Sequence, residues 1–180
     1  LRMFFVKNLL IVVDFQNDFI NGSLGFEEAL NIKDLVISKI KDYREKGHDI
    51  IFTLDTHDEN YLKTEEGMNL PVKHCLKGTS GHQIYPEVLK LKRGEDLVFE
   101  KNTFPSLALG KYLENKDYQR VELCGLVSNI CVLSNAVIVK SALPNAHVIV
   151  DALATESFDK TLHKMTLDVL EGLQVEVLNK

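Results

Sequence analysis

Six short, strand-like apolar runs constrain the fold of this chain more than any other feature of its sequence. Their residues are apolar without alternation, which is typical of strands buried on both faces of a parallel sheet. Amphipathic helical patterns separate them, as the crossovers of such a sheet require. The sequence therefore predicts a three-layer α/β/α fold with a doubly wound, mainly parallel sheet of about six strands. The runs end near Asp14, Asp55, Lys101, Gly125, Asp151 and Leu178.

Three helices are expected between these runs. One begins at Asn31 as N-cap and stops at Gly47, because apolar residues between them recur with a helical period. Residues 129–142 are apolar almost all round, which predicts a largely buried helix. A third helix is capped by Ser157, and its expected apolar positions are Phe158, Leu162, Met165 and Val169.

Length and composition favour one domain spanning residues 1–180. A chain of 180 residues with 45% hydrophobic content can bury one substantial core. The net charge of −5 argues against a nucleic-acid partner, because no broad cationic surface is available for phosphates. Lys7 and Asn8 interrupt the apolar start, so neither a signal peptide nor a membrane span is expected, and we predict a cytoplasmic protein. Three cysteines are too few for a disulfide scaffold, and the glycines form no dinucleotide-binding fingerprint.

Polar residues gather where the predicted strands end. In a doubly wound sheet the carboxyl ends of the strands form one rim, and ligands bind there. We expect this rim to hold Asp14, Asp55, Lys101, Cys131 and Asp151.

Cys131 is a candidate nucleophile near the start of the buried helix, where free N–H groups and the helix dipole lower a thiol pKa. Asp14 is placed to accept its proton, and Lys101 to hold the two anions together. Backbone N–H groups from Val127 to Cys131 are candidates for an oxyanion hole. A cysteine in an apolar helix is on its own more often core, but its combination with Asp14 and Lys101 favours catalysis.

A metal site is predicted beside this trio. Side chains alternate along a strand, so Asp55 and His57 point to the same side, and His74 can approach from the long polar loop of residues 58–83. One carboxylate and two imidazoles suit Zn, Fe or Mn, with water or a glutamate completing the shell. The remaining cysteines, Cys75 and Cys124, are expected to be non-ligating, and His48, His82, His147 and His163 to be surface residues.

Three separated motifs closely resemble the isochorismatase-like cysteine hydrolases, and the nicotinamidase-like branch in particular. They are residues 14–19 (DFQNDF), Lys101 and residues 124–132 (CGLVSNICV), and the match spans most of the chain. The resemblance implies that Cys131 is the nucleophile, Asp14 the base and Lys101 the activating cation. It also implies a cis peptide bond, which we expect between Val127 and Ser128.

The same resemblance implies that Asp55, His57 and His74 bind a divalent metal, preferably zinc. The fourth protein ligand is Glu66 or Glu65, between which the spacing does not decide. In this branch the ion holds the pyridine nitrogen of the substrate. Phe19 resembles one aromatic wall of the pocket and Phe104 is a candidate for another, and family members assemble into homo-oligomers.

The chain departs from that branch at one side of the pocket. It contains no Trp, and Pro71 stands three residues before His74, where a ring-stacking aromatic is usual. Hydrolysis of nicotinamide to nicotinate and ammonia is the preferred reading, with the small-molecule amide as the only partner needed. The alternatives are a carbamoyl or ureido amidohydrolase, an isochorismatase-type hydrolase, and a noncatalytic metal-binding protein.

Overall fold

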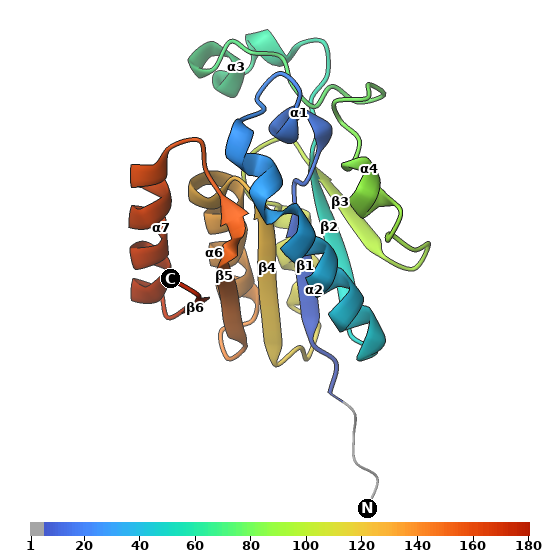
Figure 1. The fold of residues 1–180 in the computed structure, drawn as a ribbon, viewed down its shortest axis with the longest axis vertical. Coiled ribbons are helices and arrows are strands. Elements are labelled where there is room, and N and C mark those ends of the chain that lie inside the picture. The colour runs from blue at the N-terminus through green and yellow to red at the C-terminus, as the bar shows by residue number, and fades with distance from the viewer. Residues whose placement is uncertain (1–5) are drawn as a thin grey trace, which may run out of the picture.

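The computed structural model describes residues 6–180, in which six parallel strands form one sheet with helices on both faces (Figure 1). The strand order is β3-β2-β1-β4-β5-β6, with every neighbouring pair parallel, so the predicted fold class is confirmed. The predictions on the apolar chain start fall largely on residues 1–5, which lie outside the described residues. The strands are β1 (Leu9–Val13), β2 (Asp49–Asp55), β3 (Leu97–Lys101), β4 (Arg120–Leu126), β5 (His147–Glu156) and β6 (Glu176–Leu178).

Two apolar cores lie on opposite faces of the sheet. Leu10 and Val12 of β1 belong to the core beneath α2 (Lys33–Glu45). Leu9, Ile11 and Val13 belong to the core beneath α5 (Leu107–Leu113), α6 (Leu133–Ala142) and α7 (Lys160–Gly172). This alternation follows from the period of a strand and explains why the whole run is apolar. The helices are α1 (Asn17–Ile20), η1 (Glu27–Ile32), α2 (Lys33–Glu45), η2 (Tyr61–Lys63), α3 (Glu65–Asn69), α4 (Pro86–Leu89), α5 (Leu107–Leu113), η3 (Ser128–Val132), α6 (Leu133–Ala142) and α7 (Lys160–Gly172).

Two predicted helix starts were wrong. The 3₁₀ helix η1 leads directly into α2 at Lys33, so Asn31 caps nothing; burial of Ala29 and Ile32 starts helical structure earlier in the chain. Helix α7 is capped by Asp159, whose side chain accepts a hydrogen bond from the N–H of Leu162, and not by Ser157.

The apolar stripe predicted for α7 does not face the core. Phe158, Leu162, Met165 and Val169 are 60%, 41%, 56% and 51% exposed. The buried face consists of Thr166, Leu167 and Leu170 instead. Helix α7 therefore has apolar side chains on two adjoining faces, of which the sheet covers one. The face with Leu167 and Leu170 packs against the sheet, and the predicted stripe stays at the surface.

Two further expectations need correction. Residues 129–142 do not form one helix, because the chain makes the π-helical turn η3 before α6 begins at Leu133. Strand β5 continues to Glu156, so Asp151 lies within the strand and not at its carboxyl end. There its carboxylate pairs with Lys39 of α2 at 2.9 Å, away from the other predicted rim residues.

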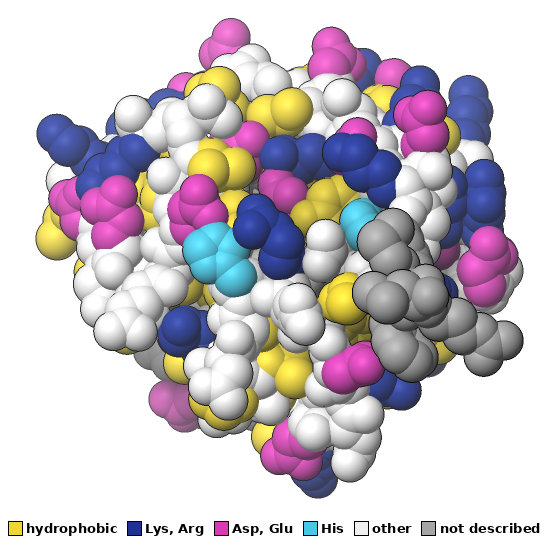
Figure 2. All heavy atoms as spheres, turned by 90° about the horizontal axis from the view of Figure 1, so that it is seen from below, with side chains coloured by type: hydrophobic (Ala, Val, Ile, Leu, Met, Phe, Trp, Pro, Cys, Tyr) yellow, Lys and Arg dark blue, Asp and Glu magenta, His cyan; other side chains and the backbone are white. Residues whose placement is uncertain are grey.

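The amino ends of the strands lie on the face of the molecule opposite to their carboxyl ends. Basic and acidic side chains are interspersed on this face (Figure 2). A cavity of about 450 Å³ lies at this end. Its charged groups are paired, as Arg44 with Asp96 at 2.6 Å and Lys7 with Asp49 at 2.9 Å. The cavity is lined by no cysteine, so the candidate nucleophile lies elsewhere. Among residues 6–180, no helix is long and apolar enough to cross a membrane.

Candidate active site and metal-binding cluster

Asp14 directly follows β1 and is completely buried. Its φ of 45° lies in the left-handed region, which aspartate tolerates better than most residues. The backbone N–H donates to the carbonyl oxygen of Thr53 at 3.1 Å, and the Thr53 hydroxyl donates to Asp14 Oδ1 at 2.7 Å. Thr53 therefore fixes the carboxylate and leaves Oδ2 for a second partner. Thr53 was not predicted, because a threonine within a buried strand carries no distinguishing signal.

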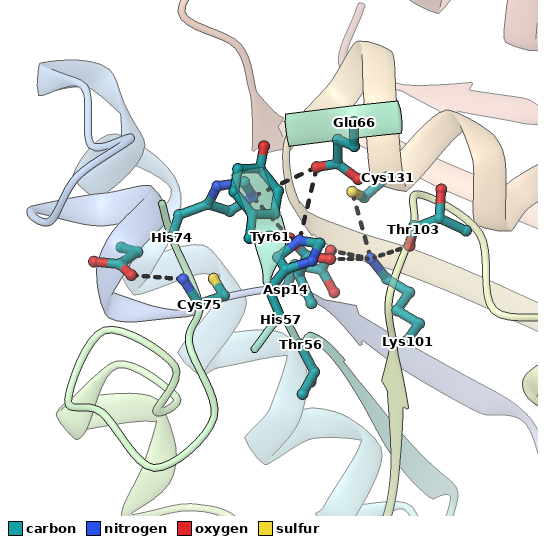
Figure 3. A network of polar contacts seen from close by, with 12 residues as sticks. Asp14, Thr56, His57, Tyr61, Glu66, His74, Cys75, Lys101, Thr103 and Cys131 are labelled. Carbon is teal, nitrogen blue, oxygen red and sulfur yellow. Dashed lines mark hydrogen bonds and ion pairs between the residues drawn. The ribbon is translucent and has the colours of Figure 1, made fainter. Parts of the chain in front are cut away.

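Lys101 supplies that second partner from the end of β3, two strands away from β1 (Figure 3). Its Nζ lies 2.6 Å from Asp14 Oδ2, 3.1 Å from the carbonyl oxygen of Thr103, and 3.6 Å from Cys131 Sγ. Burial lowers the pKa of Lys101, but the negative charges of Asp14, Cys131 and Asp55 together outweigh it and raise that pKa above its ordinary value. The lysine therefore stays charged between an acid and a thiol.

Cys131 lies in η3 with only 6% of its surface exposed. Burial raises the pKa of its thiol well above the ordinary value; Asp14 raises it further, and Lys101 lowers it in part. The net shift of this pKa is upward and not downward as expected, because desolvation of the buried thiolate outweighs the charge of Lys101. Burial likewise raises the pKa of Asp14, with Lys101 opposing it. A thiol and a carboxyl with raised pKa values are suited to exchange one proton.

The backbone before Cys131 contains a cis peptide bond, but it joins Leu126 to Val127 and not Val127 to Ser128 as expected. The bond lies where β4 ends and η3 begins. Gly125 precedes it with φ of 113°, and a Cβ at this position would lie 2.1 Å from the carbonyl oxygen of Val13. Only glycine fits there, so β1 and β4 approach closely just before the chain turns toward the thiol.

Four possible metal ligands converge next to this trio. Asp55 Oδ2 lies 3.0 Å from His57 Nε2 and 3.1 Å from His74 Nε2. Glu66 Oε1 from α3 lies 3.7 Å and 3.6 Å from the same two nitrogens. One atom from each of the four residues falls within 4.8 Å of all the others. Glu65, the other candidate, faces away and accepts a hydrogen bond from Asn69.

The donor set fits a divalent cation. Two carboxylates and two imidazoles are buried or half-buried together, and Glu66 Oε2 is buried with no hydrogen-bond partner. Burial lowers the pKa of His74, but hydrogen bonds with Asp55 and Glu66 raise it to about 10. The carboxylates of Asp55 and Glu66 thus favour a positive charge at this position, and a metal ion supplies that charge without protonation of a ligand.

Neighbouring groups orient these ligands. The Nδ1 atom of His74 lies 2.7 Å from the carbonyl oxygen of Val72, so Nδ1–H donates outward and Nε2 faces the cluster. Tyr61 packs against both imidazoles, with its ring centroid 4.6 Å from that of His57 and 4.9 Å from that of His74. Tyr61 was not predicted, since its role depends on how the loop of residues 58–83 folds back over the sheet.

The DFQNDF segment holds that loop in place. The Gln16 side chain donates to the carbonyl oxygens of Asp55 and His82, both at 2.9 Å. Asp18 Oδ2 accepts a hydrogen bond from the N–H of Cys75 at 2.7 Å, which fixes the backbone next to His74. His82 was expected at the surface, but it is buried and lies 2.8 Å from the Thr56 hydroxyl, because the loop covers it.

A pocket of about 370 Å³ connects the thiol with the metal cluster, since both Cys131 and His74 line it. Phe19 and Phe104, the two expected wall residues, also line this cavity. The sequence did not point to Phe26, Leu70 and Phe158, which also line it. Phe26 and Phe158 meet edge to face at 6.1 Å, so an aromatic pair from distant segments closes one side. The pocket is therefore walled by aromatic and aliphatic side chains, with the reactive groups at its ends.

Removal of one metal ligand should abolish tight metal binding. The variants His57→Ala and Asp55→Ala each leave three donors, and loss of a ligand should lower the affinity for zinc by at least about a hundredfold. Metal content after dialysis, measured by mass spectrometry, checks this expectation. His147→Ala is the matched control, because His147 is exposed and pairs with Glu176 far from the cluster. Full metal content in His57→Ala would contradict the assignment.

Comparison with known proteins agrees with this architecture. The model of the Isochorismatase domain matches residues 8–180. An uncharacterized isochorismatase family protein, PncA, of Bacillus subtilis (strain 168) is 28% identical over 174 residues, covering 90% of this chain and 93% of the relative. The nicotinamidase of Saccharomyces cerevisiae (strain ATCC 204508 / S288c) is 25% identical over 218 residues, covering 95% and 99%.

Solved structures show the same fold. The crystal structure of nicotinamidase/pyrazinamidase PncA from Bacillus subtilis superposes with a TM-score of 0.84 at 27% identity, covering 97% of this chain and 100% of that one. The pyrazinamidase of Pyrococcus horikoshii in complex with zinc also gives 0.84, at 23% identity, covering 97% and 99%. With a family model spanning nearly every described residue, this chain belongs to the isochorismatase family and, within it, to the nicotinamidase-like branch.

Proposed function

We propose that the protein hydrolyses nicotinamide to nicotinate and ammonia, and that Cys131 forms a thioester with the substrate. The observation that carries this proposal is the contact of Lys101 Nζ with both Asp14 Oδ2, at 2.6 Å, and Cys131 Sγ, at 3.6 Å. An acid, a cation and a thiol are thus held together at the end of an apolar pocket. Similarity to nicotinamidases supports the choice of reaction class.

In this mechanism the thiol proton of Cys131 moves to the Asp14 carboxylate while Lys101 stabilises the thiolate. The sulfur attacks the amide carbonyl carbon, and N–H groups of Val127, Ser128 and Cys131 are proposed to stabilise the oxyanion. Asp14 then protonates the leaving nitrogen, the C–N bond breaks, and ammonia departs. Water attacks the thioester, giving its proton to Asp14, and the C–S bond breaks to release the acid. The proton on Asp14 finally returns to the sulfur.

The proposed metal is zinc, held by Asp55, His57, Glu66 and His74. Bound there, the ion would supply a Lewis acid for the ring nitrogen of the substrate. Three of these residues, Asp55, Glu66 and His74, line the same cavity as the Cys131 thiol, which supports a position for the ring between them. Iron and manganese accept the same donor types, and metal analysis of the purified protein distinguishes the three.

The pocket favours an aromatic amide over the alternative substrates. Ureido acids and isochorismate carry carboxylates, which need a cationic side chain for recognition. No lysine or arginine lines this pocket in the described part of the chain, and Lys101 beneath it is paired with Asp14. Phenylalanine walls suit a flat ring instead. Fold alone cannot make this choice, because one fold hosts several activities.

A panel of amides tests the proposal. Ammonia release should be fastest with nicotinamide, and benzamide, which has the same shape without the ring nitrogen, should react at least about tenfold more slowly in kcat/KM. N-carbamoyl amino acids and isochorismate should be poor substrates. Faster turnover of a carbamoyl substrate would overturn the choice of nicotinamide. No ammonia from any amide, with metal bound at full stoichiometry, would favour a noncatalytic metal-binding protein.

We also propose that the protein is a cytoplasmic homo-oligomer. The exposed Leu162, Met165 and Val169 on α7 support self-association, since their 3-4 spacing suits packing against a second copy of the same helix. Light scattering after size exclusion gives the mass that tests it, and a monomer at micromolar concentration would contradict it. Three unpaired cysteines are in keeping with a reducing compartment. A single domain spanning residues 1–180 stays a prediction.

A further inference from the structure

The turn that carries Cys131 is fixed from outside by the segment that joins β5 to α7. The Ser128 hydroxyl lies 2.8 Å from His163 Nδ1 on α7. The next residue, Asn129, accepts a hydrogen bond from the Ser157 hydroxyl at 2.7 Å. Two consecutive residues of η3 are thus tied to the same distant segment. Neither His163 nor Ser157 lines the pocket, so these contacts do not serve substrate binding.

The local backbone explains why η3 needs such support. Its amides crowd onto one acceptor, because the N–H groups of Ile130 and Val132 both donate to the carbonyl oxygen of Val127, at 3.1 Å and 3.2 Å. A π-helical turn is rare and usually occurs at functional sites. Its conformation therefore depends on contacts beyond its own hydrogen bonds.

His163 is suited to hold Ser128 in one rotamer. Ser128 is completely buried, so its hydroxyl needs a partner inside the protein. His163 is half-buried, and this burial lowers its pKa, which favours the neutral ring at pH 7. Glu156 Oε1 lies 3.9 Å from the same Nδ1 atom and is itself paired with Lys160 at 2.9 Å. The serine hydroxyl and a neutralised carboxylate thus face the same nitrogen of His163, and the serine is the nearer of the two.

We propose that His163 is a positioning residue for the amide hydrolysis: through the Ser128 hydroxyl it fixes the turn that aims Cys131 and the neighbouring amides at the substrate carbonyl. This inference rests on the proposed function. It assigns to α7 a part in catalysis that the sequence does not predict, since His163 is expected at the surface. A small misplacement of reacting groups lowers the rate by up to about a hundredfold even when binding is unchanged.

The test compares His163→Ala with His163→Asn, whose side-chain amide can occupy the position of Nδ1. Alanine should lower kcat for nicotinamide about 10- to 100-fold while KM changes less than about twofold. Asparagine should recover most of kcat. Ser128→Ala should match His163→Ala, and the double variant should be no worse than either, because the two residues act as one unit. His147→Ala is the control for loss of an exposed histidine.

The outcomes separate this inference from the proposed function. An active wild-type enzyme with unchanged kcat in a folded His163→Ala would overturn the positioning role alone. A wild-type enzyme that hydrolyses no amide would overturn both. If His163→Ala does not fold, His163→Asn and Ser128→Ala decide the matter. Equal loss of kcat in His163→Asn and His163→Ala, at equal melting temperature, would also contradict a role for the hydrogen bond.

Discussion

Ammonia release from nicotinamide should fall at least about a thousandfold when Cys131 is replaced by alanine, because no other thiol among residues 6–180 lines the pocket. The expectation follows from the distance of 3.6 Å between Cys131 Sγ and Lys101 Nζ, and from the contact of Lys101 with the carboxylate of Asp14. The measurement is a coupled ammonia assay at saturating substrate and full metal content. Metal content should be unchanged, since the cluster of Asp55, His57, Glu66 and His74 does not include the sulfur.

Cys124→Ala provides the matched control. Cys124 is also fully buried and lies in β4, seven residues before Cys131, but its side chain does not line the pocket. Its removal should cost some stability and leave kcat within about twofold. Retention of normal activity in Cys131→Ala would rule out a thioester on this residue, and loss of activity only in Cys124→Ala would move the nucleophile elsewhere.

The sheet could be predicted because both of its faces are covered. Leu9 to Val13 are all buried, alternately on the α2 face and on the α5–α7 face. Because both faces are covered, every residue of the run is apolar, and this pattern is visible in the sequence. The pocket end of the sheet could be predicted for the same reason. In parallel strands the carboxyl ends of β1, β2 and β3 must lie at one edge, which brings together Asp14, just after β1, and Asp55 and Lys101, the last residues of β2 and β3.

The expectation that Asp151 ends its strand was wrong, because the apolar pattern of a sequence does not specify where a strand ends. A polar residue after four apolar ones looks like a strand end, but Asp151 is satisfied within β5 by Lys39 and Asn179. Strand β5 therefore extends five residues further, to Glu156, and its carboxyl end lies next to η3. The same extension brings Ser157 and His163 to the nucleophile turn.

The roles of Phe158 and His163 could not be derived from periodicity. Helix α7 has apolar residues on two adjoining faces, and only the packed structure decides that Leu167 and Leu170 face the sheet. Phe158 then lies at the mouth of the pocket against Phe26, 132 positions earlier in the chain. The raised pKa of Cys131 could not be predicted either. It is caused by burial, and burial depends on packing that the position in the sequence does not specify.

The second large effect is expected at Asp14. Asp14→Asn keeps the shape of the side chain but removes the proton acceptor, so kcat should fall about a thousandfold or more. It also leaves Lys101, 6% exposed, without its nearest counter-ion. Loss of one partner of a buried ion pair costs about 3–5 kcal/mol in the free energy of unfolding. Urea unfolding should therefore show a large loss of stability together with the loss of activity.

The double variant Asp14→Asn, Lys101→Met separates these two effects. It removes both charges and replaces the lysine by an apolar side chain of similar length, so most of the lost stability should return. Activity should not return, because neither the proton acceptor nor the cation beside Cys131 is present. Recovery of kcat along with stability would mean that the pair serves the fold alone. Stability regained at unchanged, minimal kcat would show that Asp14 and Lys101 act on the thiol itself.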